Sequence, residues 1–380
     1  MKRIALCIMT AGILFTPFVA GAQSPWAWSD ISRNIGQPRN RPVWAVAQAR
    51  GFWYFTDGIG FENGGHVQRG NGMILADLTR ALTRAGLLRV DDIVSDGKTV
   101  LFLKNVMGRS PLFEVVSFDG VKFVNRTKRL RAWFDADEGI ASVSGRDGQW
   151  AFVTTKGKVR IFPNFENLRS RPVATSGVEP VVPVGDLPQF AGAISYSIRH
   201  ASPADGHEDI PVAIVPFDKG WLIAQRRENT TFLSYTTIAG AVDITARVGH
   251  IERLQAIAWN GTSVLLAGTQ RSDGVTDRII YLEPDKVTDF SDQARLIPFK
   301  TPSRVIAAWN GTSWMILNGK DLLRFDGTHF ESLGKTRDYF LTIAGAPDGS
   351  FVLGGVVSEK SRDEIPNRLT AKLVRVVESR

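Results

Sequence analysis

The feature that most constrains this chain is a pattern that returns about every 50 residues: an apolar strand, a glycine-containing turn and a second apolar strand. Its clearest copies are the two AWNGTS motifs at residues 258–263 and 308–313. A fixed period of about 40 to 50 residues is typical of propeller blades or solenoid turns, because each unit buries its apolar face only against its neighbours. The sequence therefore predicts a repeat protein built from β-hairpins.

The hairpin occurs seven times. Asn-Gly and Asp-Gly turns need positive φ angles, which Gly and Asn reach most readily. A second element follows each hairpin; it is a strand pair in all copies but the truncated last one, and most copies lead into Asp or Asn and then Ser or Thr. Because four strands per repeat are the content of a propeller blade, we predict an all-β, seven-bladed β-propeller with four-stranded blades. The turn glycines are Gly51, Gly97, Gly148, Gly220, Gly261, Gly311 and Gly349.

The two ends of the chain carry complementary parts of one repeat. The last repeat stops after KLVRVV at residues 372–377, whereas WAWSDIS at residues 26–32 has the form of a fourth strand with no strands before it. We therefore predict that the N-terminal strand joins the last blade and closes the ring, which removes exposed strand edges. A β-sandwich or a two-domain β protein would also show short strands and Gly turns, but it does not predict these complementary ends.

One stretch departs from the strand pattern. Residues 76–88, ADLTRALTRAGLL, have the apolar spacing of a short helix between blades.

The repeat that contains WMILNG at residues 314–319 and LLRFDGTHF at residues 322–330 resembles those of two-component-regulator-type sensor propellers. In those repeats a Trp-containing strand leads into a Leu-x-Arg-Phe-Asp-Gly pattern. The average repeat length in this chain, about 51 residues, is close to that of kelch propellers. The resemblance covers most of the chain as a repeat pattern and is close in one or two units. It implies a propeller that binds ligands or proteins, although no sensor kinase follows in this sequence.

The beginning of the chain differs from the rest. Two basic residues precede an apolar run over residues 4–19, and Ala-Gly-Ala at residues 20–22 offers the small side chains of a signal-peptidase site. We interpret residues 1–22 as a signal peptide and residues 23–380 as one exported domain, periplasmic or extracellular. An uncleaved membrane anchor is the alternative, but polar residues and a proline interrupt this short run, and no later stretch has the roughly 18 apolar residues of a membrane helix.

Cysteine usage excludes several kinds of chemistry. The only cysteine, Cys7, lies in the predicted signal peptide, so the mature chain has no thiol. Disulfide frameworks, thiolate nucleophiles and cysteine metal sites are therefore excluded. With 43% hydrophobic residues and a mean hydropathy of -0.06, the chain can still bury a large core.

The AWNGTS motif has a functional and a structural interpretation. Trp259 and Trp309 could form a binding platform, and Asn260 and Asn310 could be glycosylation acceptors. However, Trp alternates with Ala as expected for a strand that packs between blades, and Asn-Gly makes the turn. We interpret the motif as structural.

No residue set indicates catalysis, a metal or a cofactor. The polar stretch PADGHEDIP at residues 203–211 matches neither an EF-hand nor a zinc helix, so we interpret it as an acidic loop. The glycine-rich residues 56–65 lead into a strand rather than the helix that a phosphate-binding loop requires. Glycoside hydrolysis needs two opposed carboxylates, and no such pair stands out. A glycan-active hydrolase or lyase is the alternative function, and catalysis stays the less favoured prediction.

Basic residues gather in the segments that join the fourth strand of one blade to the first strand of the next. Six of these crossovers hold 17 Lys and Arg against five acids, on a mature chain of net charge +6. Such charge separation steers an anionic partner to one face, although solvated loops are often charged without a binding role. The crossovers counted are residues 33–42, 80–90, 126–137, 246–253, 292–304 and 334–338.

We predict that this basic face is the binding surface. Its densest part is NRTKRLRAWF at residues 125–134. An insertion at about residues 171–209, net acidic, lengthens one repeat, and it is expected on the binding face or over the channel. The predicted residues are Arg39, Arg41, Arg84, Arg126, Lys128, Arg129, Arg131, Trp133, Arg304 and Arg337.

The sequence thus predicts an exported, monomeric, non-catalytic binding or scaffold propeller. Its partner is expected to be an anionic polysaccharide or a protein, with no nucleic acid, metal or cofactor.

Overall fold

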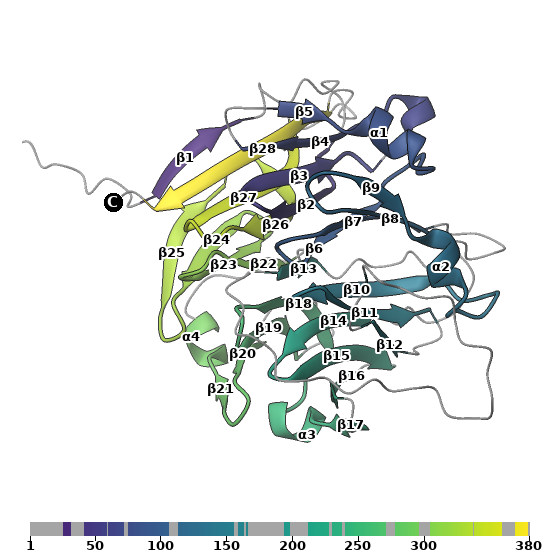
Figure 1. The fold of residues 1–380 in the computed structure, drawn as a ribbon. Helices are drawn as coiled ribbons and strands as arrows, with labels where there is room; N and C mark the ends of the chain where they lie inside the picture. Colours follow the sequence, from purple (N-terminus) through teal and green to yellow (C-terminus); the bar gives the residue numbers. More distant parts are fainter. Residues whose placement is uncertain are drawn as a thin grey trace, which may run out of the picture.

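The computed structural model is a seven-bladed β-propeller (Figure 1). The inner strand of each blade lies against the inner strands of both neighbouring blades, and the contact between the last and first blades closes the ring. The predicted fold class is therefore confirmed. The structure describes residues 26–31, 42–58, 60–71, 75–105, 113–155, 159–162, 165, 194–197, 212–227, 230–237, 240–270, 278–295, 305–336, 338–358 and 369–378.

The first three blades follow one another along the chain, and sequential strands within each blade pair antiparallel. Blade 1 contains β2 (Ala45–Ala49), β3 (Phe52–Thr56), β4 (Val67–Gly70) and β5 (Leu75–Asp77). Blade 2 contains β6 (Asp92–Ser95), β7 (Val100–Asn105), β8 (Phe113–Phe118) and β9 (Phe123–Asn125). The described strands of blade 3 are β10 (Ile140–Arg146), β11 (Gln149–Thr154) and β12 (Val159–Phe162).

Blades 4 to 6 repeat the same antiparallel order. Blade 4 contains β14 (Val212–Phe217), β15 (Gly220–Arg227), β16 (Thr230–Thr237) and β17 (Gly240–Asp243). Blade 5 contains β18 (Arg253–Trp259), β19 (Val264–Thr269), β20 (Arg278–Leu282) and β21 (Val287–Asp289). Blade 6 contains β22 (Val305–Trp309), β23 (Trp314–Asn318), β24 (Asp321–Phe325) and β25 (Phe330–Lys335).

Blade 7 is assembled from both ends of the chain. Its first three strands are β26 (Tyr339–Gly345), β27 (Ser350–Ser358) and β28 (Leu369–Glu378), and its outer strand is β1 (Trp26–Asp30). β1 pairs antiparallel with β28, with Trp26 opposite Glu378 and Asp30 opposite Val374. The predicted closure by the N-terminal strand is confirmed. The predicted signal peptide lies outside the described residues.

One further strand, β13 (Ile194–Ser197), comes from the predicted insertion. It pairs antiparallel with β18, the inner strand of blade 5, so that sheet has five strands. It also lies against β14, β22 and β26, the inner strands of blades 4, 6 and 7. Contact with four inner strands places β13 at the axis of the ring, where Figure 1 draws it. The rest of residues 171–209 lies outside the described residues.

The core lies between the blade sheets. Trp150, Trp259 and Trp314 are among the largest fully buried side chains. Neighbouring inner strands converge toward the axis, and at one point the approach requires glycine: a Cβ on Gly345 would lie only 1.9 Å from the carbonyl oxygen of Trp309. Such a contact would force the two backbones apart.

Short helices begin four of the crossovers. They are α1 (Thr79–Arg84), α2 (Thr127–Arg131), α3 (Thr245–Val248) and α4 (Ser291–Arg295), and a 3₁₀ helix, η2 (Phe61–Asn63), precedes β4. The helix predicted within residues 76–88 is confirmed as α1. The other three were not predicted, because helices of four or five residues are too short to show an apolar period. Within the described ranges, no helix has the length and apolar character needed to cross a membrane.

Candidate functional site

The ring has two faces, which we name by the connections that they carry. The crossover face carries the segments from the outer strand of one blade to the inner strand of the next, with α1 to α4. The turn face carries the connections from first to second strands and from third to fourth strands, such as β18–β19 and β8–β9. Every inner strand therefore runs from the crossover face to the turn face.

The AWNGTS motifs lie on the turn face and hold hairpins together. The strands end and restart at paired residues, Trp309 opposite Trp314, so the loop has four residues and is longer than the Asn-Gly pair that was expected to make the turn. The reason is the Asn310 side chain: its Oδ1 accepts the Thr312 and Ser313 N–H groups at 3.0 and 2.8 Å. Its Nδ2 donates to the Gly349 carbonyl of blade 7 at 2.7 Å. With Asn310 buried, these bonds support the structural interpretation of the motif.

Blade 2 uses a carboxylate for the same purpose. Buried Asp96 accepts the N–H groups of Lys98 and Thr99 in its own loop and of Gly148 in blade 3, the last at 2.8 Å. Polar side chains at the turn-face ends of inner strands therefore connect blades through backbone hydrogen bonds.

Several pKa shifts on the turn face lie on or beside blades 3 and 4. Burial lowers the pKa of the Arg146 guanidinium, whose Nη1 donates to the Asp218 carbonyl and whose Cζ lies 5.6 Å from the Trp221 ring centroid. Burial, together with the Asp218 carboxylate, raises the pKa of Tyr235 to about 12. Burial also raises the pKa of Asp147 against the opposing effect of Lys98. The contacts of Arg146 and Asp147 join neighbouring blades, and Tyr235 contacts Asp218 within blade 4, so we interpret them as structural.

A repeated motif, Asp or Asn followed by any residue and then Thr or Ser, begins the helical crossovers. In blade 4, Asp243 Oδ1 accepts the Thr245 N–H at 2.8 Å, and Thr245 Oγ1 accepts the Leu233 N–H at 2.9 Å. The middle residue, Ile244, donates its N–H to the Leu233 carbonyl at 2.9 Å. The same three bonds occur at residues 77–79, 125–127 and 289–291.

This motif explains the position of Arg126. The middle residue of the motif is buried, and it is Leu78, Ile244 or Phe290 in the other three copies but Arg126 in blade 2. Arg126 Nε donates to Ser117 Oγ at 2.9 Å, and its Cζ lies 5.6 Å from the Phe165 ring centroid. At 3% exposure, Arg126 does not lie on the surface where the sequence analysis placed it. Aligning the four motifs in the sequence would have indicated this buried position.

Trp133 is also mostly structural. It packs against the buried cluster of blades 2 to 5, and its ring makes an edge contact with Phe162 at a centroid distance of 5.9 Å. The aromatic side chain expected beside the basic residues is therefore partly buried and packs against the core.

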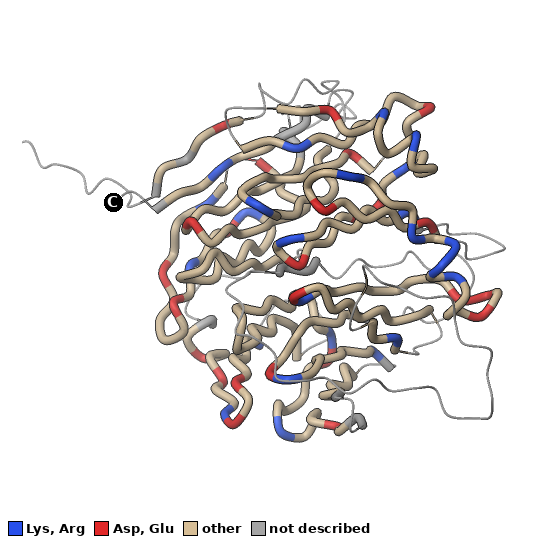
Figure 2. The backbone as a smooth tube through the Cα atoms, viewed as in Figure 1, with Lys and Arg blue, Asp and Glu red and all other residues tan. Residues whose placement is uncertain are grey.

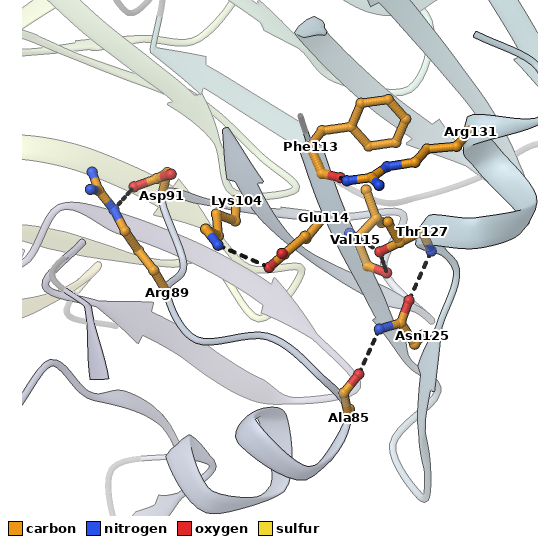
Figure 3. Close-up of polar contacts among 10 residues, drawn as sticks. All are labelled: Ala85, Arg89, Asp91, Lys104, Phe113, Glu114, Val115, Asn125, Thr127 and Arg131. Carbon is orange, nitrogen blue, oxygen red and sulfur yellow. Dashed lines mark hydrogen bonds and ion pairs between the residues drawn. The ribbon is translucent and has the colours of Figure 1, made fainter. Parts of the chain in front are cut away.

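The remaining predicted cations of α2 are exposed. Lys128, Arg129 and Arg131 lie on the surface of the crossover face. Figure 3 shows Arg131 folded back toward β8, where its Nη2 donates to the Phe113 carbonyl at 3.2 Å. This bond restrains Arg131, so its guanidinium has a more defined position than a freely rotating side chain has.

Asn125 joins the crossover of α2 to that of α1. Its Nδ2 donates to the Ala85 carbonyl, just after α1, at 2.7 Å (Figure 3). Exposed Arg84, the last residue of α1, is therefore part of the same surface as the α2 cations. Figure 2 shows the basic segments at α1 and α2 along one side of the ring. We call Arg84, Lys128, Arg129 and Arg131 the basic patch.

Other charges on this face limit the extent of the patch. Asp135 and Asp137 are exposed just after α2, and Lys104 pairs with Glu114 at 3.2 Å. Arg89 pairs with the buried Asp91 (Figure 3). On the described crossover face, the exposed cations of the patch therefore lie at α1 and α2, and acids lie close to them.

Four predicted residues, Arg39, Arg41, Arg304 and Arg337, lie outside the described residues, as does the acidic loop at residues 203–211. Among the residues that the structure describes, no group of three or more His, Cys, Asp or Glu is arranged to hold a metal ion.

No protein-family model matches the sequence, and no curated protein is similar to it in sequence. Solved structures are similar in fold. The extracellular domain of a protein assigned to the one-component systems of B. thetaiotaomicron aligns with a TM-score of 0.53 and 12% identity, covering 93% of this chain and 42% of that one. The WD40 repeats of RRP9 align with a TM-score of 0.48 and 9% identity, covering 92% of this chain and 97% of that one. An acylaminoacyl peptidase of Pyrococcus horikoshii aligns with a TM-score of 0.49 and 10% identity, covering 87% of this chain and 50% of that one.

The likeness to the B. thetaiotaomicron domain concerns the fold. The chain spans less than half the length of the B. thetaiotaomicron structure, and at 12% identity the likeness concerns architecture alone. The resemblance to sensor propellers that the repeats suggested is therefore confirmed at the level of the fold.

Proposed function

We propose that this protein is an exported, non-catalytic binding or scaffold propeller whose basic patch binds an anionic polysaccharide or an acidic protein. The observation that carries the proposal is the Asn125–Ala85 hydrogen bond, because it joins two crossovers so that Arg84 and the α2 cations share one surface. Clustered like charges of this kind raise the local concentration of an oppositely charged partner.

The spacing of the patch favours a polyanion over a single small anion. Its cations come from two helices in different crossovers, so a chain of negative charges can contact several of them at once. Each exposed contact contributes little alone, on the order of 0.2–1 kcal/mol, and salt weakens it. Binding is therefore expected to depend on several contacts together.

Export is part of the proposal and is supported by the signal-peptide pattern of residues 1–22. The fold likeness to an extracellular domain is compatible with it.

The test is binding to an immobilised polyuronate and to polyglutamate at increasing NaCl concentrations. We expect affinity to fall steadily with salt, and Lys128→Ala/Arg129→Ala to reduce it about fivefold at low salt. The matched control is Lys122→Ala/Lys286→Ala, which removes two exposed cations from turn-face loops. Binding without salt dependence, or an equal loss in the control variant, would show that the basic patch is not the binding surface.

A further inference from the structure

The inner edge of β18 is used in a way that the blade pattern does not require. In a blade, the inner strand pairs with the second strand on one side, and its other edge turns its backbone N–H and C=O groups toward the ring axis. In blade 5 that edge pairs with β13, with Ile194 opposite Trp259 and Ser197 opposite Ala256. Addition of a strand to a free sheet edge is a common way to bind an extended polypeptide.

β13 runs in the direction that a fourth strand takes. Phe165, after blade 3, lies near the turn face, because its N–H donates to the Gly148 carbonyl at 3.3 Å. β13 begins opposite Trp259 at the turn-face end of β18 and runs toward the crossover face, where β14 begins. β13, which lies between blades 3 and 4 in the sequence, therefore passes along the axis toward the crossover face.

The pairing is short. Four opposed residues allow at most about four backbone hydrogen bonds, and each contributes about 1 kcal/mol net. The pairing of β13 with β18 is therefore stabilised largely because residues 163–193 and 198–211 connect β13 covalently to blades 3 and 4. Tethering of this kind corresponds to an effective concentration in the mM range.

The chemistry at this edge suits an uncharged strand. Ile194–Ser197 reads Ile-Ser-Tyr-Ser, and its partners on β18, from Ala256 to Trp259, are apolar and fully buried. An ionised side chain at this position would lose its hydration without facing an opposite charge on the paired residues, Ala256 to Trp259. The occupant of this edge therefore differs from the polyanion proposed for the basic patch.

We propose that the inner edge of β18 is a docking site for an uncharged, extended polypeptide segment of a partner protein, and that β13 is the chain's own competitor for it. The partner segment adds as an antiparallel strand in the place of β13. Backbone hydrogen bonds to β18 provide affinity, and the apolar side chains of the inner strands select against charged sequences.

A disulfide lock tests this directly. Ser195 lies opposite Ala258, and side chains at opposed positions of an antiparallel pair have Cβ atoms about 4.5–5.5 Å apart, close to disulfide range. We expect Ser195→Cys/Ala258→Cys, in a Cys7→Ser background, to form an intramolecular disulfide in air, seen by mass spectrometry. Failure of this disulfide to form in the folded protein would contradict the pairing on which the proposal rests.

The probe is a fluorescent peptide with the sequence of residues 191–199, compared with a scrambled peptide of the same composition. We expect it to bind the reduced Cys variant at least tenfold more tightly than the oxidised one, in polarisation titrations. The same protein in two redox states serves as the matched control. Equal affinity in both states, or no binding to the reduced state, would overturn the proposal.

A second variant removes β13 without a covalent lock. Proline lacks the N–H group and disfavours strand pairing, so Ser195→Pro/Tyr196→Pro should free the β18 edge. We expect the peptide to bind this variant at least tenfold more tightly than the unmodified chain, and the scrambled peptide to bind neither. Polyglutamate binding should be the same in every variant, so that failure of this proposal and failure of the basic patch give different results.

Discussion

The turn face and the crossover face are built from the same repeats but use their polar residues differently. On the turn face, Asn310 and Asp96 are buried, and their side chains join one blade to the next. On the crossover face, the Asp/Asn and Thr/Ser side chains of the repeated motif stabilise the start of each helix, and the cations of α1 and α2 point outward. The repeated polar residues are thus structural, whereas Lys128 and Arg129, which lie outside the repeated motif, are exposed.

The largest expected effect is at the turn-face end of β26. Gly345→Ala should cost about 3 kcal/mol or more of unfolding free energy, because the added Cβ would meet the Trp309 carbonyl at 1.9 Å. Gly349→Ala is the control: it has open space but a φ of +84°, so it should cost about 1–2 kcal/mol. Urea unfolding of both variants measures the difference. Equal losses would mean that neighbouring blades are less tightly joined than the structure indicates.

The two AWNGTS copies differ in burial, and this allows a finer test. Asn310 is buried, and Asn310→Ala removes the partner of the Gly349 carbonyl and of two loop N–H groups, so we expect a loss of about 2–3 kcal/mol. Asn260 also accepts the two loop N–H groups but is partly exposed, so Asn260→Ala should cost about 1 kcal/mol. Thermal and urea unfolding would contradict this reading if the order were reversed.

On the crossover face, stability and binding should separate. Thr245→Val removes the Oγ1 that accepts the Leu233 N–H, and it should cost about 1 kcal/mol without changing polyanion binding. Lys128→Ala/Arg129→Ala should do the opposite, with stability unchanged within about 0.5 kcal/mol and weaker binding. Unfolding and polyanion-binding measurements on both variants test this prediction. Weaker polyanion binding by Thr245→Val would contradict it.

The smallest effect is the dependence of stability on pH. The Thr245 hydrogen bonds lower the pKa of Asp243. Burial alone would raise the pKa of Asp77, but hydrogen bonds from Thr79 and the nearby His66 lower it. Burial would likewise raise the pKa of Asp289, but hydrogen bonds from Ser291 and the nearby Arg278 lower it. The pKa of Asp326 falls to about 2 because hydrogen bonds from Thr328 and His329 outweigh burial.

A carboxyl with a lower pKa in the folded chain stabilises the fold above the unfolded pKa, near 3.8, and this stabilisation is lost as the pH falls toward the folded value. We therefore expect the melting temperature to be steady above pH 5 and to fall between about pH 4 and 2. Asp326→Asn should show a smaller drop over that range. A drop of unchanged size would mean that other carboxyls dominate the acid response.

Repetition made the fold predictable. Seven turn glycines and two complementary ends sufficed for the blades and the closing strand, because hairpin turns and strand alternation are local properties. The same logic predicted α1 but missed α2, α3 and α4, whose four or five residues carry too little periodicity. The four-residue AWNGTS loop was also missed, because the Asn310 side chain, rather than a backbone carbonyl, accepts the loop N–H groups.

The candidate site was harder to predict, because exposure depends on packing rather than on residue type. Arg126 and Lys128 are two residues apart in one basic stretch, yet Arg126 is buried and Lys128 is exposed. The pairing of β13 with β18 joins segments about 60 residues apart, and the alternation in residues 194–197 is typical of a strand but does not identify its partner. Long-range pairing of this kind follows from the three-dimensional path of the chain.

The composite blade 7 has a consequence for the order of assembly. β1 is among the first described segments to be synthesised and β28 is the last, so they pair only after the blades between them have been made. Pairing over such a sequence separation is slow compared with hairpin formation. Blades 1 to 6 can thus form during synthesis or transport, whereas the outer strand of blade 7 waits for the end of the chain. Closure of the ring is therefore expected to be a late, distinct kinetic step in folding.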